Sequence, residues 1–362
     1  MTGRSLDPSG REVEPLLAVR DLRVHFPITR GVVFRRTVGM VRAVDGVSLD
    51  VYAGETVGLV GESGSGKSTL GRAIVRLYRP TSGSIVFRGV DLATLRGKDA
   101  TRLATELQMV FQDPYSSLDP RMSVGACIAE PLAIHRVGTR TERSRQVDEL
   151  LSTVGLPART AGRYPHELSG GQRQRVGLAR ALALNPSLVV ADEAVSALDV
   201  SVQAQILNLL RRLQRDLRLT YLFIAHDLGI VRHISDRIAV MYLGQIVETA
   251  GTDELHANPL HPYSIALLSA IPRPDPEAES RRKHIVLPGD PPSPAAPPPG
   301  CRFHTRCWLR HQLGDPERCA TETPELRASA SGVGHSVACH FVDESRASPE
   351  RASVRLEGSA TG

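Results

Sequence analysis

The chain has 362 residues, with 44 Lys and Arg against 39 Asp and Glu, so its formal net charge is +5. Its 41% of hydrophobic residues can bury a substantial core, which excludes wholesale disorder. No uninterrupted apolar run approaches the roughly 18 residues that a membrane-spanning helix needs, and the polar start from Met1 to Arg11 does not resemble a secretory signal. We therefore expect a cytosolic protein, and the small excess of positive charge indicates nucleic-acid binding only weakly.

Apolar runs and helical stretches alternate along most of the chain. The apolar runs have the character of short strands and cover residues 16–26, 43–51, 56–61, 107–111, 188–191 and 221–225. Helical patterns follow several of them, at residues 68–78 for example, and fill most of residues 123–160. Because strands that alternate with helices form parallel sheets, the sequence predicts an α/β core with a helical insertion. We place the core at residues 15–257 and its helical subdomain at about 113–183, after a flexible N-terminus over residues 1–14.

The composition changes after residue 257. Ten prolines lie between Pro272 and Gly300, too many for a packed helix or a central strand, so we expect this stretch to be extended. It is the main part of a proline-rich connecting segment that we place at residues 258–300. Four of the five cysteines follow within residues 301–342. Residues 343–362 are rich in Ser, Ala, Arg and Glu, and we expect this tail to be disordered.

A glycine-rich turn between the third expected strand and the next helix matches the P-loop pattern and reads GESGSGKST from Gly61 to Thr69. Its backbone N–H groups can surround phosphate oxygens, and the helix N-terminus adds the positive end of its dipole. Lys67, one of only three lysines in the chain, is expected to reach the β- and γ-phosphates of a nucleotide, and the Ser68 hydroxyl to bind Mg²⁺. The predicted nucleotide-binding residues of this turn are Gly61, Ser63, Gly64, Ser65, Gly66, Lys67, Ser68 and Thr69.

A later apolar strand ends in two acidic residues, Asp192 and Glu193. Ligands of open α/β sheets gather at the carboxyl ends of the strands, so these carboxylates are expected beside the P-loop. We predict that Asp192 holds Mg²⁺ and that Glu193 is the general base that activates the attacking water. Taken alone, the pattern also fits a strand followed by an acidic turn.

The pentapeptide LSGGQ, residues 168–172, lies upstream of the acidic strand. With the P-loop it makes the chain resemble the ABC-transporter ATPases, whose signature motif has this sequence. The resemblance implies an α/β fold with a P-loop NTPase-type ABC ATPase core, a helical subdomain and, in this chain, a cysteine-containing C-terminal extension. It also implies a head-to-tail dimer, in which the signature motif meets the γ-phosphate of ATP held by the P-loop of a second subunit. The signature residues assigned to this contact are Ser169, Gly170, Gly171 and Gln172.

Further residues fall where this family has functional ones. Gln112 matches the Q-loop glutamine that contacts Mg²⁺ and the attacking water, and His226 matches the switch histidine that contacts the γ-phosphate. Asp199 ends a segment similar to the D-loop, a dimer contact. Phe26 is the candidate for stacking on adenine, with an ordinary core phenylalanine as the alternative. The family usually has proline after the catalytic glutamate, whereas this chain has Ala194; we still predict ATP hydrolysis because both acidic residues are present.

Three other segments resemble the ATPases of oligopeptide and dipeptide importers, in particular their F-type subunit: residues 111–121 (FQDPYSSLDPR), 163–167 (RYPHE) and 258–263 (NPLHPY). The resemblance covers about residues 15–342 and implies a peripheral subunit on the cytoplasmic face of the inner membrane. Its implied partners are a D-type ATPase that completes a heterodimer, two membrane permeases and an extracellular substrate-binding protein, with no nucleic acid. The alternatives are a nickel or other solute importer of the same branch, a soluble DNA-acting ABC ATPase and a non-catalytic ATP-dependent binding module.

The C-terminal part of the chain contains Cys301, Cys307, Cys319 and Cys339. In a reducing compartment such a group indicates a metal or cluster site more readily than disulfides. Its spacing resembles the segment that holds a [4Fe–4S] cluster in members of this branch, which implies a cluster with a structural role. From the residues alone, zinc and unmetallated thiols also stay open. Cys127 lies in an apolar helical stretch and is expected to be a buried core residue.

Overall fold

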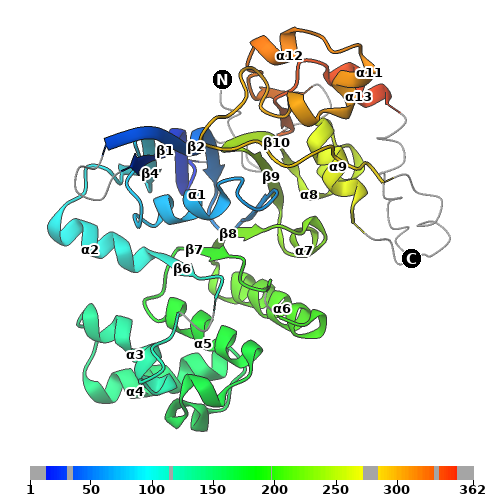
Figure 1. The fold of residues 1–362 in the computed structure, drawn as a ribbon. Helices are drawn as coiled ribbons and strands as arrows, with labels where there is room; N and C mark the ends of the chain where they lie inside the picture. Colours follow the sequence, from blue (N-terminus) through cyan, green and yellow to red (C-terminus); the bar gives the residue numbers. More distant parts are fainter. Residues whose placement is uncertain are drawn as a thin grey trace.

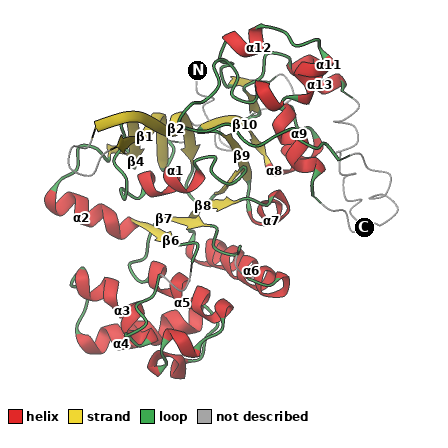
Figure 2. Ribbon diagram, in the orientation of Figure 1, coloured by secondary structure: helices red, strands yellow, loops and turns green. Residues whose placement is uncertain are grey.

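The structure is a computed structural model that describes residues 14–30, 36–113, 117–196, 198–271, 284–329 and 334–348. Strands lie in the middle of the molecule (Figures 1 and 2). The helices α3 (Val124–Ile134), α4 (Arg140–Thr153) and α5 (Gly170–Leu182) form a separate part at one end, and the cysteine-containing region lies at the other. None of the helices in the described ranges combines the length and the hydropathy that a membrane span requires.

The central sheet has eight strands in the order β11-β12-β10-β9-β3-β8-β7-β6. A parallel set of neighbouring strands forms its middle. These strands are β3 (Thr56–Val60), β6 (Leu107–Val110), β7 (Leu188–Asp192), β8 (Thr220–Ala225) and β9 (Arg237–Tyr242). Every residue of β3, β7 and β8 is buried, which explains why the sequence shows them as nearly continuous apolar runs. The α/β core with a parallel sheet is thus confirmed.

A second sheet is antiparallel and has the strand order β2-β1-β4-β5. Its strands are β1 (Leu17–Arg30), β2 (Arg36–Val51), β4 (Ser82–Phe87) and β5 (Val90–Asp91). Leu17 of β1, Leu59 of β3 and Leu70 of helix α1 (Lys67–Ile74) belong to one hydrophobic core cluster. This shared core fixes the helix that follows the P-loop against both sheets. Helix α2 (Gly97–Glu106) leads from this region into β6.

The helical part divides where the backbone turns sharply. The sequence predicts a mostly helical stretch over residues 123–160, but Arg136 and Gly138 have positive φ angles of 56° and 65° and separate α3 from α4. Helix α4 then begins at a capping box between Thr139 and Glu142, which satisfies backbone donors at its N-terminus. Cys127 is buried in α3, as expected.

Helices α6 and α7 follow strands β7 and β8 of the parallel set. Helix α6 (Val200–Leu217) buries Ile206, Leu210 and Leu213, at the spacing of one helix face, and it exposes a row of arginines on its outer side. Helix α7 (Leu228–Ile234) follows β8 and begins at Asp227, whose side chain accepts hydrogen bonds from backbone N–H groups of the first turn.

The C-terminal region continues the central sheet. Strand β10 (Gln245–Gly251) is antiparallel to β9, β12 (Ser336–Val337) pairs with β10, and β11 (Arg327–Ala328) pairs with β12. Short helices complete the region: α8 (Thr252–Ala257), α9 (Pro262–Ser269), α11 (Trp308–Gln312), α12 (Arg318–Thr321) and α13 (Val342–Ala347). The extension is therefore bonded to the ATPase core through a shared sheet.

One sequence expectation needs correction in this region. Helix α9 lies at the start of the proline-rich connecting segment, ahead of the stretch expected to be extended; His261 caps its N-terminus and its apolar residues are buried. Helix α13 lies where the disordered tail was expected to begin, and the Ser345 hydroxyl donates to the Leu260 carbonyl at 2.6 Å. Residues 284–300 contain no helix or strand, as expected. The rest of the tail, residues 349–362, and residues 1–13 lie outside the described ranges.

Candidate functional site

The P-loop, residues 61–69, joins β3 to α1, as predicted. Gly61, Gly64 and Gly66 have φ angles of 152°, 78° and 103°. A Cβ atom on Gly61 would lie 2.1 Å from the Met241 carbonyl oxygen, and one on Gly66 would lie 2.0 Å from the Ala43 carbonyl oxygen. Both contacts are with backbone, which cannot move aside cheaply. The turn therefore needs glycine for its close packing against neighbouring strands as well as for its φ angles.

Lys67 lies inside this turn, with its side chain almost fully buried. Its ammonium group donates to the carbonyl oxygens of Gly61 at 2.7 Å and Glu62 at 2.9 Å. Burial lowers the pKa of Lys67, and the nearby carboxylates of Glu193, Asp192 and Glu62 act against that shift. A compact cation held among backbone carbonyls can turn toward phosphate oxygens when these enter the loop.

Asp192 lies at the carboxyl end of β7 and is completely buried. The Ser68 hydroxyl donates to its Oδ1 at 2.7 Å, and an Arg72 nitrogen lies 3.8 Å from its Oδ2. Burial raises the pKa of Asp192, which the hydrogen bond from Ser68 partly offsets. Oδ2 accepts no hydrogen bond within the described part of the chain. A hydroxyl and a carboxylate with spare acceptor capacity fit Mg²⁺, which prefers oxygen ligands.

Glu193 follows β7 with a φ angle of 47°, an unfavourable conformation for a residue with a side chain. Its N–H donates to the Ile224 carbonyl of β8 at 2.9 Å, which holds this conformation. Gln112 Nε2 donates to Glu193 Oε2 at 2.7 Å, and His226 Nδ1 lies 3.7 Å from the same oxygen. These three residues follow β6, β7 and β8, which are neighbours in the sheet, so the sheet order brings them together.

The signature motif opens helix α5. Ser169 and Gln172 form a capping box, in which the Ser169 hydroxyl accepts from the Gln172 N–H at 3.3 Å and the Gln172 side chain accepts from the Ser169 N–H at 3.1 Å. A Cβ atom on Gly171 would lie 2.5 Å from Val202 of α6, so glycine is needed there. Among the described residues, no hydrogen bond joins the motif to the P-loop of the same chain.

Asp199, the residue expected at the D-loop, is the N-cap of α6 and makes no capping hydrogen bond with its side chain. The next residue, Val200, is 81% exposed. Gly170 and Gly171 pack near Leu198 and Val202, so the signature motif and this helix start lie side by side.

Comparisons with known proteins agree with this arrangement. Residues 44–196 match the family described as ABC transporter, and residues 247–313 match the C-terminal region of the oligopeptide/dipeptide transporter family. The oligopeptide transport ATP-binding protein AppF of Bacillus subtilis is 53% identical over 91% of this chain and 98% of its own length. The chain belongs to the oligopeptide/dipeptide branch of the ABC-transporter ATPases.

Solved structures of related cassettes share the fold of its core. The dimeric ATP-binding cassette MJ0796 in a post-hydrolysis state with ADP and phosphate is 28% identical, with a TM-score of 0.58 over 65% of this chain and 98% of that one. CbiO1 of Clostridium perfringens, part of the transporter complex cbiONQ, is 27% identical, with a TM-score of 0.59 over 67% of this chain and 91% of that one. This ABC ATPase therefore has the catalytic apparatus of an ATP-hydrolysing subunit.

The candidate for adenine stacking, Phe26, is partly buried in β1. Its ring makes an edge-on contact with Tyr78, with centroids 5.2 Å apart, and packs against the core cluster shared by the two sheets. This position is compatible with both readings of Phe26, and its contact with adenine stays a prediction.

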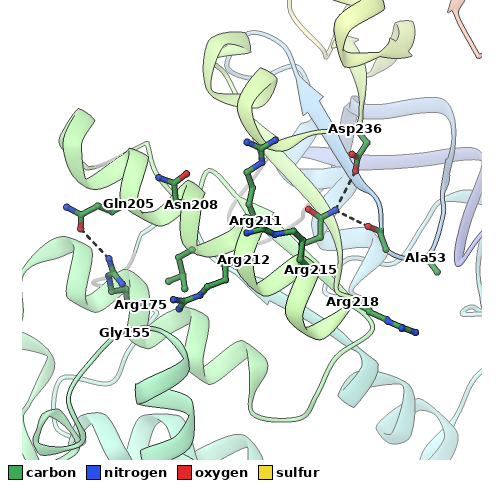
Figure 3. A pocket seen from close by; sticks show the side chains of 13 residues that line it. Ala53, Gly155, Arg175, Gln205, Asn208, Arg211, Arg212, Arg215, Arg218 and Asp236 are labelled. Atoms are coloured by element: carbon green, nitrogen blue, oxygen red, sulfur yellow. Dashed lines mark hydrogen bonds between the residues drawn. The ribbon is translucent and has the colours of Figure 1, made fainter. Parts of the chain in front are cut away.

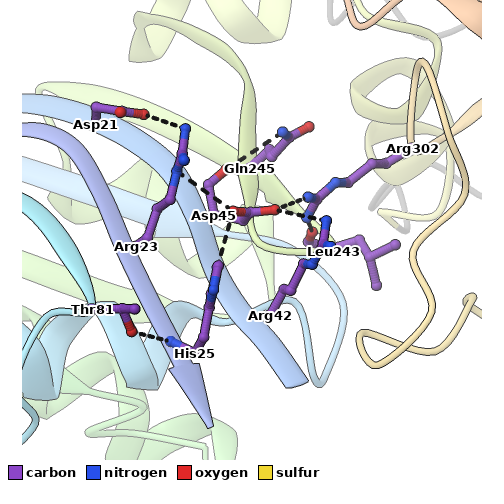
Figure 4. A network of polar contacts seen from close by, with 9 residues as sticks. All are labelled: Asp21, Arg23, His25, Arg42, Asp45, Thr81, Leu243, Gln245 and Arg302. Carbon is purple, nitrogen blue, oxygen red and sulfur yellow. Dashed lines mark hydrogen bonds and ion pairs between the residues drawn. The ribbon is translucent and has the colours of Figure 1, made fainter. Parts of the chain in front are cut away.

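Sequence reasoning missed several residues through which the C-terminal extension contacts the P-loop and strand β2. Arg306 pairs with Glu62 at 2.8 Å, and the Tyr263 hydroxyl accepts a hydrogen bond from the Glu62 N–H at 2.8 Å. Arg302 pairs with Asp45 in a network that includes His25 and Arg23 (Figure 4). Both arginines lie between Cys301 and Cys307, which marks the segment as one of interest, but no sequence pattern predicts which residues they contact.

The four C-terminal cysteines line one small cavity of about 20 Å³. All are free thiols, and burial raises the pKa of Cys301 to about 11 and that of Cys307 to about 12. Cys307 Sγ accepts from the Arg310 N–H and Cys339 Sγ from the Phe341 N–H, each at 3.4 Å. In the described ranges, no group of three or more His, Cys, Asp or Glu side chains is arranged to hold a metal ion. The sulfurs thus share a cavity without forming a preformed metal site in the described part of the chain.

Two other hollows lie away from the P-loop. A pocket of about 1180 Å³ is lined by arginines of α6 and by Arg175 of α5 (Figure 3). The arginines of α6 are exposed, and Asp236 in its wall already accepts from the Thr56 N–H, so we interpret this pocket as a solvated basic face. A groove of about 300 Å³ runs between β6 and the helical part, where Leu77, Phe111 and Ile134 are 56%, 38% and 68% exposed.

Proposed function

We propose that this chain is the ATP-hydrolysing subunit of an importer that carries dipeptides or oligopeptides across the inner membrane and works on its cytoplasmic face. The name of AppF and the match to the oligopeptide/dipeptide C-terminal region support the peptide substrate. The observation that carries the ATPase function is the convergence of Glu193, Gln112 and His226 beside the Ser68–Asp192 pair.

Each residue of this site has a chemical role in the proposal. The P-loop N–H groups and Lys67 bind the phosphates, while Ser68 and Asp192 hold Mg²⁺, whose charge stabilises the developing negative charge on the phosphate oxygens. Glu193 accepts the proton of the attacking water as general base. Gln112 orients the Glu193 carboxylate through its hydrogen bond, and His226 lies close enough to contact the γ-phosphate.

The site needs a second subunit for completion. The signature residues Ser169 to Gln172 present backbone donors at a helix start, and they make no hydrogen bond with the P-loop of their own chain among the described residues. We propose that they bind the ATP held by a related ATPase subunit, so that ATP closes a heterodimer. The exposed Val200 beside Asp199 fits a place in the same interface.

The exposed apolar groove fits the membrane partners. Leu77, Phe111 and Ile134 line it, and Phe111 directly precedes Gln112, which bonds to the general base. A permease helix that docks here would therefore contact the strand end that leads to the catalytic glutamate. An extracellular substrate-binding protein completes the proposed importer and selects the peptide.

We also propose that the four C-terminal cysteines hold a [4Fe–4S] cluster with a structural role. Their common cavity and the N–H donors to two sulfurs support this, because cluster-bound sulfurs commonly accept such bonds. Zinc is the alternative; in the described residues no group of three or more His, Cys, Asp or Glu side chains is arranged to hold a metal ion, and this counts against a preformed site for either one.

The function is tested by reconstituting the chain with its permeases, its paired ATPase and its binding protein in proteoliposomes. We expect ATP-dependent accumulation of labelled peptides, together with ATP hydrolysis that the loaded binding protein stimulates. Nickel uptake without peptide uptake would identify another importer of the same branch. Hydrolysis that DNA stimulates, without any uptake, would contradict the transport function.

A further inference from the structure

The C-terminal extension holds Glu62, the second residue of the P-loop, from two sides. The Glu62 N–H donates to the Tyr263 hydroxyl at 2.8 Å, and the carboxylate Oε2 lies 2.8 Å from Nη1 of Arg306. On its other side, the carbonyl oxygen of Glu62 accepts from Lys67 Nζ at 2.9 Å. One residue thus links the extension to the lysine of the phosphate-binding loop.

Arg306 is held in a fixed position. Its side chain is 8% exposed, and its Nε donates to the Pro288 carbonyl at 3.2 Å. Burial by itself lowers the pKa of Arg306, but the adjacent Tyr242 hydroxyl and Glu62 carboxylate outweigh burial and raise it. A buried guanidinium and a largely buried carboxylate depend on each other, because removing either one leaves an uncompensated charge.

The segment that carries Arg306 is anchored at several further points. Arg302 pairs with Asp45 of β2 and donates to the Leu243 carbonyl (Figure 4). The Phe303 ring packs against Tyr242 and Tyr263, with ring centroids 5.2 Å and 5.4 Å apart. The position of Arg306 is therefore determined by the whole segment from Cys301 to Cys307.

The charge of Glu62 gives this contact a consequence for nucleotide binding. Glu62 is close enough to Lys67 to act on its pKa. An unpaired carboxylate at this point would repel the triphosphate and compete with it for the lysine. Arg306 offsets that negative charge, and the Tyr263 hydroxyl fixes the backbone of the same residue.

We propose that Arg306 is a positioning residue of the nucleotide site, which pairs with Glu62 to neutralise a carboxylate beside the phosphates and to hold the P-loop in its binding conformation. The proposal rests on the ATPase function above. It makes the C-terminal extension a part of the nucleotide site, although the match to the ABC transporter family ends at residue 196.

A double-mutant cycle tests the proposal. MgATP is titrated into the full purified chain and into each of its variants, and the affinities are compared. Arg306→Gln should weaken MgATP binding about tenfold, which corresponds to ~1.4 kcal/mol. Glu62→Gln alone should weaken binding less than Arg306→Gln, because it breaks the pair without leaving a carboxylate that repels the triphosphate. Adding Glu62→Gln to Arg306→Gln should bring the affinity back to about that of Glu62→Gln alone, because the unpaired carboxylate is gone. The MgATP affinity of Arg306→Lys should lie between those of the unmodified chain and Arg306→Gln, since lysine keeps the positive charge without the planar guanidinium group.

Arg318→Gln is the matched control, because Arg318 forms an exposed pair with Glu322 in the same extension and does not contact the P-loop. Melting temperatures of all variants separate misfolding from weakened binding, and the doubly substituted chain carries the test if Arg306→Gln folds poorly. The proposal would be overturned if Arg306→Gln bound MgATP as tightly as Arg318→Gln does. It would also be overturned if the affinity lost by the double variant equalled the product of the two single losses. If the unmodified chain bound no MgATP, the proposed function itself would fail.

Discussion

Gln112 and Glu193 are joined by a hydrogen bond of 2.7 Å between the amide Nε2 and the carboxylate Oε2. The bond connects the ends of two parallel strands that are neighbours in the sheet, β6 and β7. Because Phe111, the residue before Gln112, lines the exposed apolar groove, we propose that a partner in that groove influences the orientation of Glu193, the proposed general base.

Glu193→Gln should abolish hydrolysis while preserving ATP binding. The amide cannot accept the proton of water, and loss of a general base typically costs about 10²- to 10⁴-fold in rate. The variant should accumulate as the ATP-bound heterodimer with its paired subunit, measurable by size-exclusion chromatography with MgATP. Normal turnover in this variant would remove Glu193 from its assigned role.

Lys67→Ala should act on binding itself. The substitution removes a buried cation that is expected to make charge-assisted hydrogen bonds to phosphates, worth about 1.5–3 kcal/mol, so the affinity for MgATP should fall by about tenfold or more. Calorimetric titration measures the change, and Lys98→Ala, on helix α2, is the control. Unchanged affinity would show that the lysine does not contact the phosphates.

Ile134→Asp should disrupt docking to the permeases without affecting ATP binding. Ile134 is 68% exposed in the apolar groove, and burying such a side chain in an interface contributes about 1.5–3 kcal/mol. Leu217→Asp is the control, because this half-exposed leucine of α6 lies outside the groove. Co-purification with the permeases should be lost only for Ile134→Asp; equal retention by both variants would exclude the groove as the docking site.

The cluster proposed for the four cysteines should give the purified protein a characteristic colour and metal content. Anaerobically purified chain should be brown and contain about four iron atoms per chain, as a [4Fe–4S] cluster requires. Cys319→Ser should lose the iron, whereas Cys127→Ser should keep it, because Cys127 is buried in α3 outside the cysteine cavity. Colourless protein, with zinc or with no metal, would contradict the cluster.

Because His256 is buried, we expect its contribution to folding stability to be lost at acid pH. It is buried, and burial lowers its pKa below the ordinary value of 6.5. The unfolded chain therefore binds a proton more readily than the folded one, so stability should fall as the pH drops below about 6.5 and continue to fall through the lowered folded pKa. His256→Gln does not titrate and should show a shallower decline in melting temperature between neutral and acid pH. Identical pH profiles would assign the effect to other groups.

Much of the fold could be predicted because its signals are local. Fully buried parallel strands appear as short apolar runs, and the close approaches of Gly61 and Gly66 to backbone explain the glycines of the P-loop. The division between α3 and α4 was not predicted: Gly138 is a turn signal, but Arg136, which also has a positive φ angle, is not. Helix α9 was not predicted, because its stabilisation comes from tertiary burial of its residues.

The chemistry proposed for this ATPase could be predicted from local patterns, because the P-loop, the acidic strand end and the LSGGQ motif are contiguous runs whose function depends on local backbone geometry. Which distant residues meet depends on the order and pairing of the strands. The sheet order brings Gln112, Glu193 and His226 together, and the strand pairing of β12 with β10 ties the extension to the core. The contact between Glu62 and Arg306 spans 244 positions of the chain, and no local pattern predicts such a pair.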